Sequence, residues 1–94
     1  MPYAFVQDIE GGDWDTYQAI TEEAGDERPE GLVVHVAGPT DTGVRLIDVW
    51  ESEEACQRFL SERLLPARAK VLADRGFEPM TPRIDVLDVQ HVWR

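Results

Sequence analysis

The chain has 94 residues, a length that supports a single domain over residues 1–94. Its hydrophobic fraction of 43% and charged fraction of 30% are those of an ordinary globular protein. The formal net charge of −10 argues against nucleic acid and anionic membrane surfaces as partners, because both attract cationic proteins. The single cysteine, Cys56, excludes an intrachain disulfide and a structural zinc site of several thiolates.

The first residues contain no basic segment followed by a long apolar run, so we expect no signal peptide. No apolar stretch approaches the ~20 residues that a membrane-spanning helix needs. We therefore expect a cytoplasmic protein with neither a membrane nor a nucleic acid as its partner.

The first predicted strand covers residues 3–9, where the side chains alternate between two faces. A helix is predicted over residues 13–24, because Asp13 is a good N-cap and apolar residues then recur at helical spacing. Gly25 is a suitable residue to end this helix.

A β-hairpin is predicted next. Residues 32–37 are rich in β-branched side chains, which is typical of a strand. Residues 38–43 form a cluster of turn-forming residues, and residues 44–50 again have strand character.

A second helix begins after Ser52, which is a strong N-cap. Proline disrupts the interior of an α-helix, so we expect the first segment to end near residue 65. A second segment then runs from Pro66 at its first position to residue 75, and Gly76 ends it. The last strand is predicted over residues 84–93, which alternate.

The element order is therefore β-α-β-β-α-β, the order of the ferredoxin-like α+β fold. In that fold a four-stranded antiparallel sheet carries both helices on one face. The other face of the sheet is left without a helical cover.

Strand alternation predicts which side chains the helices cover. On the covered face we expect Tyr3, Phe5, Ile9, Leu32, Val34, Val36, Ile47 and Val49. On the uncovered face we expect Ala4, Val6, Asp8, Val33, His35, Ala37, Leu46, Asp48 and Trp50. The last strand leaves two choices open for that face, either Val86, Asp88 and Gln90 or Leu87, Val89 and His91. A mixed, partly apolar face usually marks an interface or a ligand groove, so we expect two sheets to close on each other in a homodimer.

Several segments resemble the dimeric α/β-barrel superfamily, and in particular small actinobacterial members near the antibiotic-biosynthesis monooxygenases. They are residues 31–37 (GLVVHVA), residues 43–52 (GVRLIDVWES), Phe59 and residues 63–66 (RLLP). The resemblance implies a face-to-face homodimer with a pocket in each subunit between sheet and helices. Characterised members include cofactor-independent quinone-forming monooxygenases, haem-degrading enzymes, isomerases and cyclases, so the fold alone does not choose a reaction.

Haem degradation in this superfamily relies on an asparagine together with a tryptophan and a histidine. The chain contains no asparagine, which argues against a haem-degrading role. We expect no cofactor.

His35 is the most interesting single residue, because it lies mid-strand between valines and can titrate near neutral pH. It could act as a general base, orient a ligand or hold a buried hydrogen bond. Asp48 and Asp8 are expected on the same face, and a carboxylate bonded to the imidazole would fix its tautomer and raise its pKa. The alternative is that each aspartate lies in water near the sheet edge. We take His35 and Asp48 as the candidate catalytic pair.

Aromatic and apolar side chains could line a ligand pocket beside this pair. The candidates are Trp50, Trp14, Tyr17, Val33 and Val6. Trp50 could equally belong to the core or to the dimer interface. Cys56 is expected to pack as a small apolar residue. His35 and His91 are the only histidines and show no spacing typical of a metal site, so we expect no metal.

Two functional hypotheses follow. In the first, the protein is an enzyme acting on a small aromatic or polyketide-like molecule, either a cofactor-independent monooxygenase or a related isomerase or cyclase. His35 would deprotonate a phenolic substrate, and the electron-rich anion would reduce oxygen itself in a dry pocket. In the second, the protein is a non-catalytic homodimer that binds a small ligand or has a structural role. A closed pocket that His35 reaches would favour the enzyme.

Overall fold

A computed structural model of the chain describes residues 1–78 and 80–93. Its elements follow in the order β1 (Tyr3–Glu10), α1 (Trp14–Ala24), β2 (Leu32–Pro39), β3 (Gly43–Trp50), α2 (Glu53–Phe59), η1 (Leu60–Leu64), α3 (Leu65–Arg75) and β4 (Arg83–Leu87). The segments α2, η1 and α3 follow one another without a gap, and η1 is π-helical. We call them together the long helix, residues 53–75.

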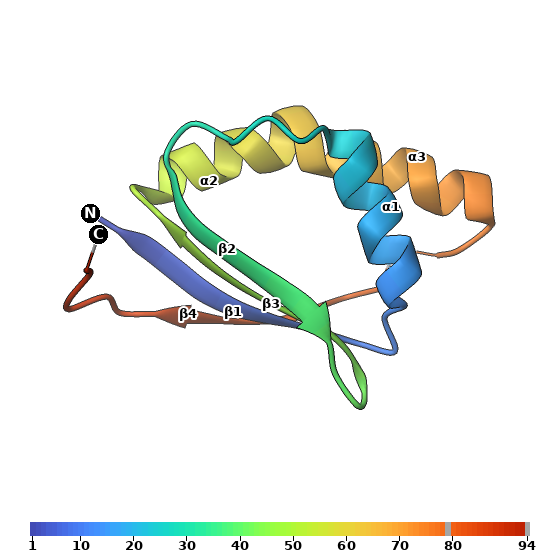
Figure 1. The fold of residues 1–94 in the computed structure, drawn as a ribbon, viewed down its shortest axis with the longest axis horizontal. Coiled ribbons are helices and arrows are strands. Elements are labelled where there is room, and N and C mark those ends of the chain that lie inside the picture. The colour runs from blue at the N-terminus through green and yellow to red at the C-terminus, as the bar shows by residue number, and fades with distance from the viewer. Residues whose placement is uncertain (79, 94) are drawn as a thin grey trace.

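The strands form one four-stranded sheet in the order β2-β3-β1-β4, and each neighbouring pair is antiparallel. Figure 1 shows α1 and the long helix on the same side of this sheet. This is the predicted ferredoxin-like α+β fold with the β-α-β-β-α-β order. Within the part of the chain that the structure describes, no helix is long and apolar enough to cross a membrane.

Both predicted N-caps are confirmed. The Asp13 carboxylate accepts a hydrogen bond from the Thr16 backbone N–H at 3.3 Å and another from the Thr16 hydroxyl at 2.8 Å. The Ser52 hydroxyl accepts from the Ala55 backbone N–H at 3.1 Å. Each bond satisfies a donor that the first turn of the helix would otherwise leave unpaired, so the two helix starts are encoded locally.

Pro66 lies in the first turn of α3, as predicted, but the chain does not leave the helical path before it. The widened turns of η1 come between α2 and α3 instead. A π-helical stretch changes the hydrogen-bonding pattern just ahead of a residue that has no N–H to donate. The last strand is shorter than predicted, because β4 ends at Leu87 and residues 88–93 are not in a strand.

The helices cover the face of β3 opposite to the one predicted. Val44, Leu46 and Asp48 are buried under the helices, whereas Ile47 on the other face is 42% exposed. Both faces of β3 carry apolar residues, so hydrophobicity alone did not distinguish them. Arg45 is the signal that was missed, because it shares the face of Ile47 and is exposed.

A β-bulge explains the error on β2. Val33 is an extra residue between Leu32 and Val34, so it has no cross-strand partner in β3. The bulge reverses the phase of alternation, which puts Leu32 and His35 on the same covered face and Val34 on the open face. The residues predicted for the uncovered face that lie on the covered face are His35, Ala37, Leu46, Asp48 and Trp50. Those that lie on the open face against prediction are Val34, Val36, Ile47 and Val49.

The faces of β1 agree with the prediction. Phe5 is buried in the main core cluster, and Tyr3 and Ile9 pack against it. On β4, Leu87 pairs with Ala4 and therefore lies on the open face, as the second of the two choices expects for that residue. Val89 and His91, the other members of that choice, lie beyond the end of the strand.

The core cluster joins the sheet to α2 through Phe5, Leu46, Trp50, Ala55 and Cys56. Cys56 is only 1% exposed, in agreement with its predicted packing role. Burial, with a smaller contribution from the Asp48 charge, raises the pKa of the Cys56 thiol to about 11. The thiolate that a nucleophile would require is therefore disfavoured.

Candidate functional site

Four polar side chains form a continuous line of hydrogen bonds between α1 and the sheet. The Nδ1 atom of His35 bonds to Oδ1 of Asp48. The indole N–H of Trp50 donates to Oδ2 of Asp48 at 3.1 Å. The hydroxyl of Tyr17 lies 3.0 Å from Nε2 of His35. We call Tyr17, His35, Asp48 and Trp50 the site network.

Strand geometry positions three of the four residues. His35 of β2 and Asp48 of β3 are cross-strand partners, so their side chains point to the same side of the sheet. Trp50 lies two residues beyond Asp48 on the same strand and therefore shares its face. Tyr17 comes from the middle of α1 and reaches the pair from the helical layer.

Asp48 is a buried carboxylate whose two oxygens both have partners. It is 7% exposed, and its oxygens are bonded to His35 and Trp50. An ionised carboxylate only accepts hydrogen bonds, so we assign the ring proton of neutral His35 to Nδ1. Nε2 is then an acceptor, and the Tyr17 hydroxyl donates to it.

The environment raises the pKa of both His35 and Tyr17. The hydrogen bond to Asp48 raises the pKa of His35 above its usual value of 6.5, against the opposing effect of burial. Burial, with a smaller contribution from the Asp48 charge, raises the pKa of Tyr17 to about 12. His35 is thus a stronger base than a free imidazole, and Tyr17 is neutral at physiological pH.

The aromatic residues of the site differ in their burial. Trp50 is 1% exposed and contacts the Phe59 ring at a centroid distance of 5.6 Å, so it is a core residue and not a wall open to a ligand. Trp14 stacks on Tyr17, with ring centroids 5.3 Å apart and planes inclined by 15°. Both stacked rings are half-buried, and they form a flat aromatic surface on α1.

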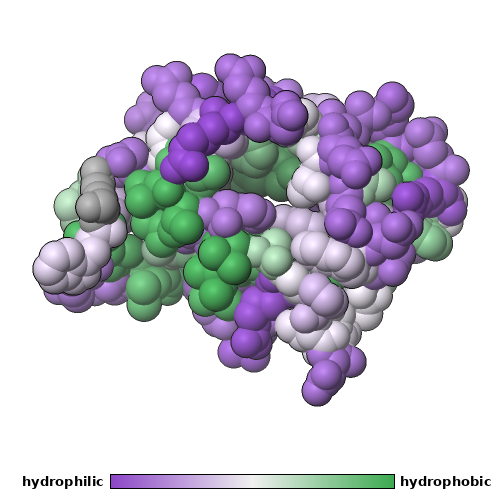
Figure 2. All heavy atoms as spheres, in the orientation of Figure 1, coloured by the Kyte–Doolittle hydropathy of each residue, from purple (hydrophilic) through white to green (hydrophobic). Residues whose placement is uncertain are grey.

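The imidazole is reachable from solvent, because His35 lies on β2, an edge strand of the sheet, and its side chain is 36% exposed. Figure 2, seen from the orientation of Figure 1, shows apolar atoms recessed between the helical layer and the sheet. In a single chain, the His35 side chain is therefore accessible to solvent at the β2 edge of the sheet.

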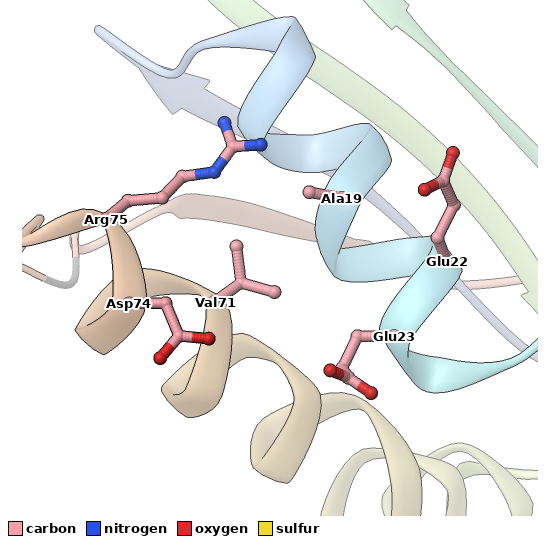
Figure 3. A pocket seen from close by; sticks show the side chains of 6 residues that line it. All are labelled: Ala19, Glu22, Glu23, Val71, Asp74 and Arg75. Carbon is pink, nitrogen blue, oxygen red and sulfur yellow. The ribbon is translucent and has the colours of Figure 1, made fainter.

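Two open surface depressions lie elsewhere. The first, between α1 and α3, is lined by Ala19, Glu22, Glu23, Val71, Asp74 and Arg75 (Figure 3). The second lies near the N-terminus and the start of α2, and is lined by Met1, Pro2, Tyr3, Ser52, Glu53, Glu54 and Gln57. His35 lines neither depression. These depressions are therefore not the closed pocket that would favour the enzyme hypothesis.

Several predicted site residues lie apart from the network. Asp8 forms an ion pair with Arg45 at 2.7 Å and, like Val6, faces away from the helices. Val33 is the bulged residue of β2. Among residues 1–78 and 80–93, no cluster of three or more His, Cys, Asp or Glu side chains could hold a metal ion.

Sequence reasoning paired His35 with Asp48 as candidates but missed how Tyr17 and Trp50 join them. The Asp48–Trp50 contact could have been predicted from the sequence, since residues two apart on a strand share a face. The Tyr17–His35 contact could not have been predicted in this way, because it depends on how α1 packs on the sheet.

Comparison with known proteins supports the fold. No model of a known protein family matches the sequence, and no curated protein matches it either. Solved structures do match over nearly the whole chain. The chain has the fold of the antibiotic-biosynthesis monooxygenases, so the resemblance noted in the sequence is confirmed at the level of fold.

Three solved structures illustrate this likeness. SnoaB, a cofactor-independent oxygenase from Streptomyces nogalater, is 20% identical with a TM-score of 0.64, and the match covers 97% of this chain and 95% of SnoaB. Rv0793 from Mycobacterium tuberculosis is 16% identical with a TM-score of 0.66, covering 98% of each chain. An antibiotic biosynthesis monooxygenase is 11% identical with a TM-score of 0.64, covering 97% of this chain and 100% of that one. At these identities the likeness concerns the fold and not the reaction.

Proposed function

We propose that the protein is an enzyme that removes a proton from a small aromatic or polyketide-like molecule, as a cofactor-independent monooxygenase or a related isomerase or cyclase. The observation that carries the proposal is the His35–Asp48 pair, a basic imidazole held by a buried carboxylate and open to solvent at the sheet edge. A fold shared with a cofactor-independent oxygenase adds support.

The proposed reaction requires few groups from the protein. His35 is the base, and Asp48 fixes its tautomer and stabilises the imidazolium that forms. A deprotonated phenol is electron-rich enough to pass electrons to dioxygen directly, so the protein needs only a base and a water-poor site. The stacked rings of Trp14 and Tyr17 offer an aromatic surface beside that base.

The single domain of residues 1–94 pairs, in this proposal, with a copy of itself through the open face of the sheet. Cross-strand register arranges that face in rows. Two rows are largely apolar and consist of Val34, Val49, Ala4 and Leu87, then Val36, Ile47, Val6 and Asp85. The next row is polar and contains the Asp8–Arg45 ion pair. None of the helices that the structure describes covers the apolar rows (Figure 1), and a second copy would remove them from water.

The alternative is a non-catalytic homodimer that binds a small ligand or has a structural role. Two observations favour it. Both ring nitrogens of His35 already have partners within the chain, as in a histidine that only holds a fold together. In addition, neither of the two surface depressions is lined by His35.

Oxygen consumption separates the two functions. Wild type, His35→Ala and Asp48→Asn are each incubated with a panel of phenols, naphthols and hydroquinones, and oxygen uptake is followed with an electrode. The proposal expects wild type to accelerate uptake with at least one compound, and His35→Ala to lose about 100-fold or more of that rate. Equal rates for wild type and His35→Ala would remove His35 from the reaction and leave the binding protein as the better description.

A further inference from the structure

The site network raises a problem for a base that acts directly. A general base must come within hydrogen-bond reach of the proton it takes, about 2.6–3.2 Å between heavy atoms. Nδ1 of His35 is occupied by Asp48, and Nε2 lies 3.0 Å from the Tyr17 hydroxyl. The nitrogen that would accept the substrate proton is therefore already accepting a hydrogen bond from the Tyr17 hydroxyl.

We propose that Tyr17 is a catalytic residue, and that its hydroxyl, rather than His35 itself, takes the proton from a phenolic or enolic O–H group of the substrate. This inference rests on the proposed function and assigns the contact atom of that site. The substrate proton moves to the Tyr17 oxygen while the Tyr17 proton moves to Nε2 of His35. The proton on Nδ1 stays in place, where the Asp48 carboxylate stabilises the resulting imidazolium.

The balance of this step involves protons only. One proton leaves the substrate, one arrives on His35, and Tyr17 ends neutral as it began. Burial raises the pKa of Tyr17 to about 12, so a free tyrosinate is not populated at neutral pH. The two transfers are therefore concerted, and Tyr17 acts as a relay rather than as an independent base. Return of the proton from His35 through Tyr17 to product or water restores the starting state.

The position of Tyr17 suits the type of substrate. Its ring is half-buried on α1 and is held in place by stacking on Trp14. A flat phenol whose hydroxyl meets the Tyr17 hydroxyl would lie beside these rings, where offset aromatic packing adds affinity. The hydroxyl thus belongs to a stacked residue of a regular helix, and a group that transfers a proton needs such a defined position.

The first test uses nitrophenol, whose anion absorbs visible light, as a probe that reports proton transfer without turnover. Binding is measured by calorimetry and ionisation by absorption, for wild type, Tyr17→Phe, His35→Ala and Tyr3→Phe. Tyr3 is the only other tyrosine and its hydroxyl is outside the network, so Tyr3→Phe is the matched control. We expect wild type and Tyr3→Phe to ionise the bound probe, and Tyr17→Phe to bind it with affinity changed less than about threefold but to leave it neutral.

The outcomes separate the relay from the proposed function. If Tyr17→Phe ionises bound nitrophenol as fully as wild type does, while His35→Ala no longer ionises it, the relay is overturned and His35 is the direct base. A wild type that leaves nitrophenol neutral and consumes no oxygen with any phenol would overturn both. If neither Tyr17→Phe nor His35→Ala ionises bound nitrophenol, the result supports the relay.

A second measurement covers the case in which removing the hydroxyl disturbs the fold. Fluorotyrosine placed at position 17 keeps the hydroxyl and nearly the same side-chain size, but its hydroxyl is more acidic than that of tyrosine. With any phenol that wild type turns over, we expect kcat to change with this replacement while KM does not, and Tyr17→Phe to lose about 100-fold in kcat. A kcat indifferent to the acidity of residue 17 would show that Tyr17 only positions His35.

Discussion

His35 and Asp48 are directly opposed on β2 and β3, and their side chains meet on the helix-covered face of the sheet. Opposed residues of antiparallel strands have Cβ atoms about 5 Å apart, which is close enough for an imidazole and a carboxylate to bond. The pair is therefore fixed by strand register, and it would be lost if β2 slipped by one residue.

Asp48→Asn should lower the pKa of His35. The hydrogen bond to the Asp48 carboxylate is the largest cause of the raised value, and an amide has no charge to favour the imidazolium. Titration of the His35 ring protons by NMR measures the change. Asp8→Asn is the control, since Asp8 lies on the open face in an ion pair with Arg45. A pKa that Asp48→Asn leaves unchanged would mean that the carboxylate does not hold the ring.

The same pair should make stability depend on pH. The folded-state pKa of His35 is raised above its usual value of 6.5, so the folded state binds the proton more tightly than the unfolded state. The stabilisation is fully present below pH 6.5 and is lost as the pH rises through the folded-state pKa. We expect the gap in unfolding free energy between wild type and His35→Gln to be largest from about pH 5 to 6.5 and to shrink above it. Urea unfolding at a series of pH values measures it, and a gap that grows with pH contradicts the assignment.

How much the sequence could predict depended on the range of the interaction. Caps act within one helical turn, so Asp13 and Ser52 were identified correctly. The element order followed from periodicity and gave the fold. The faces of β2 did not follow, because the bulge at Val33 changes the phase of alternation and its sequence resembles an ordinary strand. The link from Tyr17 to the network depends on helix packing, which no short sequence pattern encodes.

Trp50→Phe should destabilise the protein by more than the lost indole area suggests. The substitution leaves Oδ2 of the buried Asp48 carboxylate without its donor, at a cost of about 1–3 kcal/mol. Trp14→Phe removes an equally large indole that is only half-buried and lies outside the Asp48 contacts, so it serves as the control. Urea unfolding should show a clearly larger loss for Trp50→Phe, and equal losses would mean that the indole–carboxylate bond contributes nothing.

Gly31→Ala should destabilise the junction between α2 and the start of β2. Gly31 has φ +87°, and an added Cβ would lie 2.6 Å from Cβ of Ala55, which is buried. Backbone strain and overpacking together should cost about 2 kcal/mol or more. Gly38→Ala is the control, since an added Cβ there has no atom of the described residues within 4 Å. Thermal unfolding compares the two, and similar melting temperatures would show that the Gly31–Ala55 contact relaxes without cost.

Ile47→Glu should dissociate the proposed homodimer without unfolding the chain. Ile47 lies in an apolar row of the open face and is 42% exposed, so a carboxylate there can reach water in the separate chain. In a face-to-face pair of sheets the same carboxylate would be buried against apolar side chains, at a cost of several kcal/mol. Thr42→Glu, in the exposed turn between β2 and β3, adds the same charge away from this face. We expect sedimentation at micromolar concentration to give a dimer for wild type and Thr42→Glu and a folded monomer for Ile47→Glu. A wild-type monomer, or an Ile47→Glu dimer as tight as wild type, would contradict pairing through the open face.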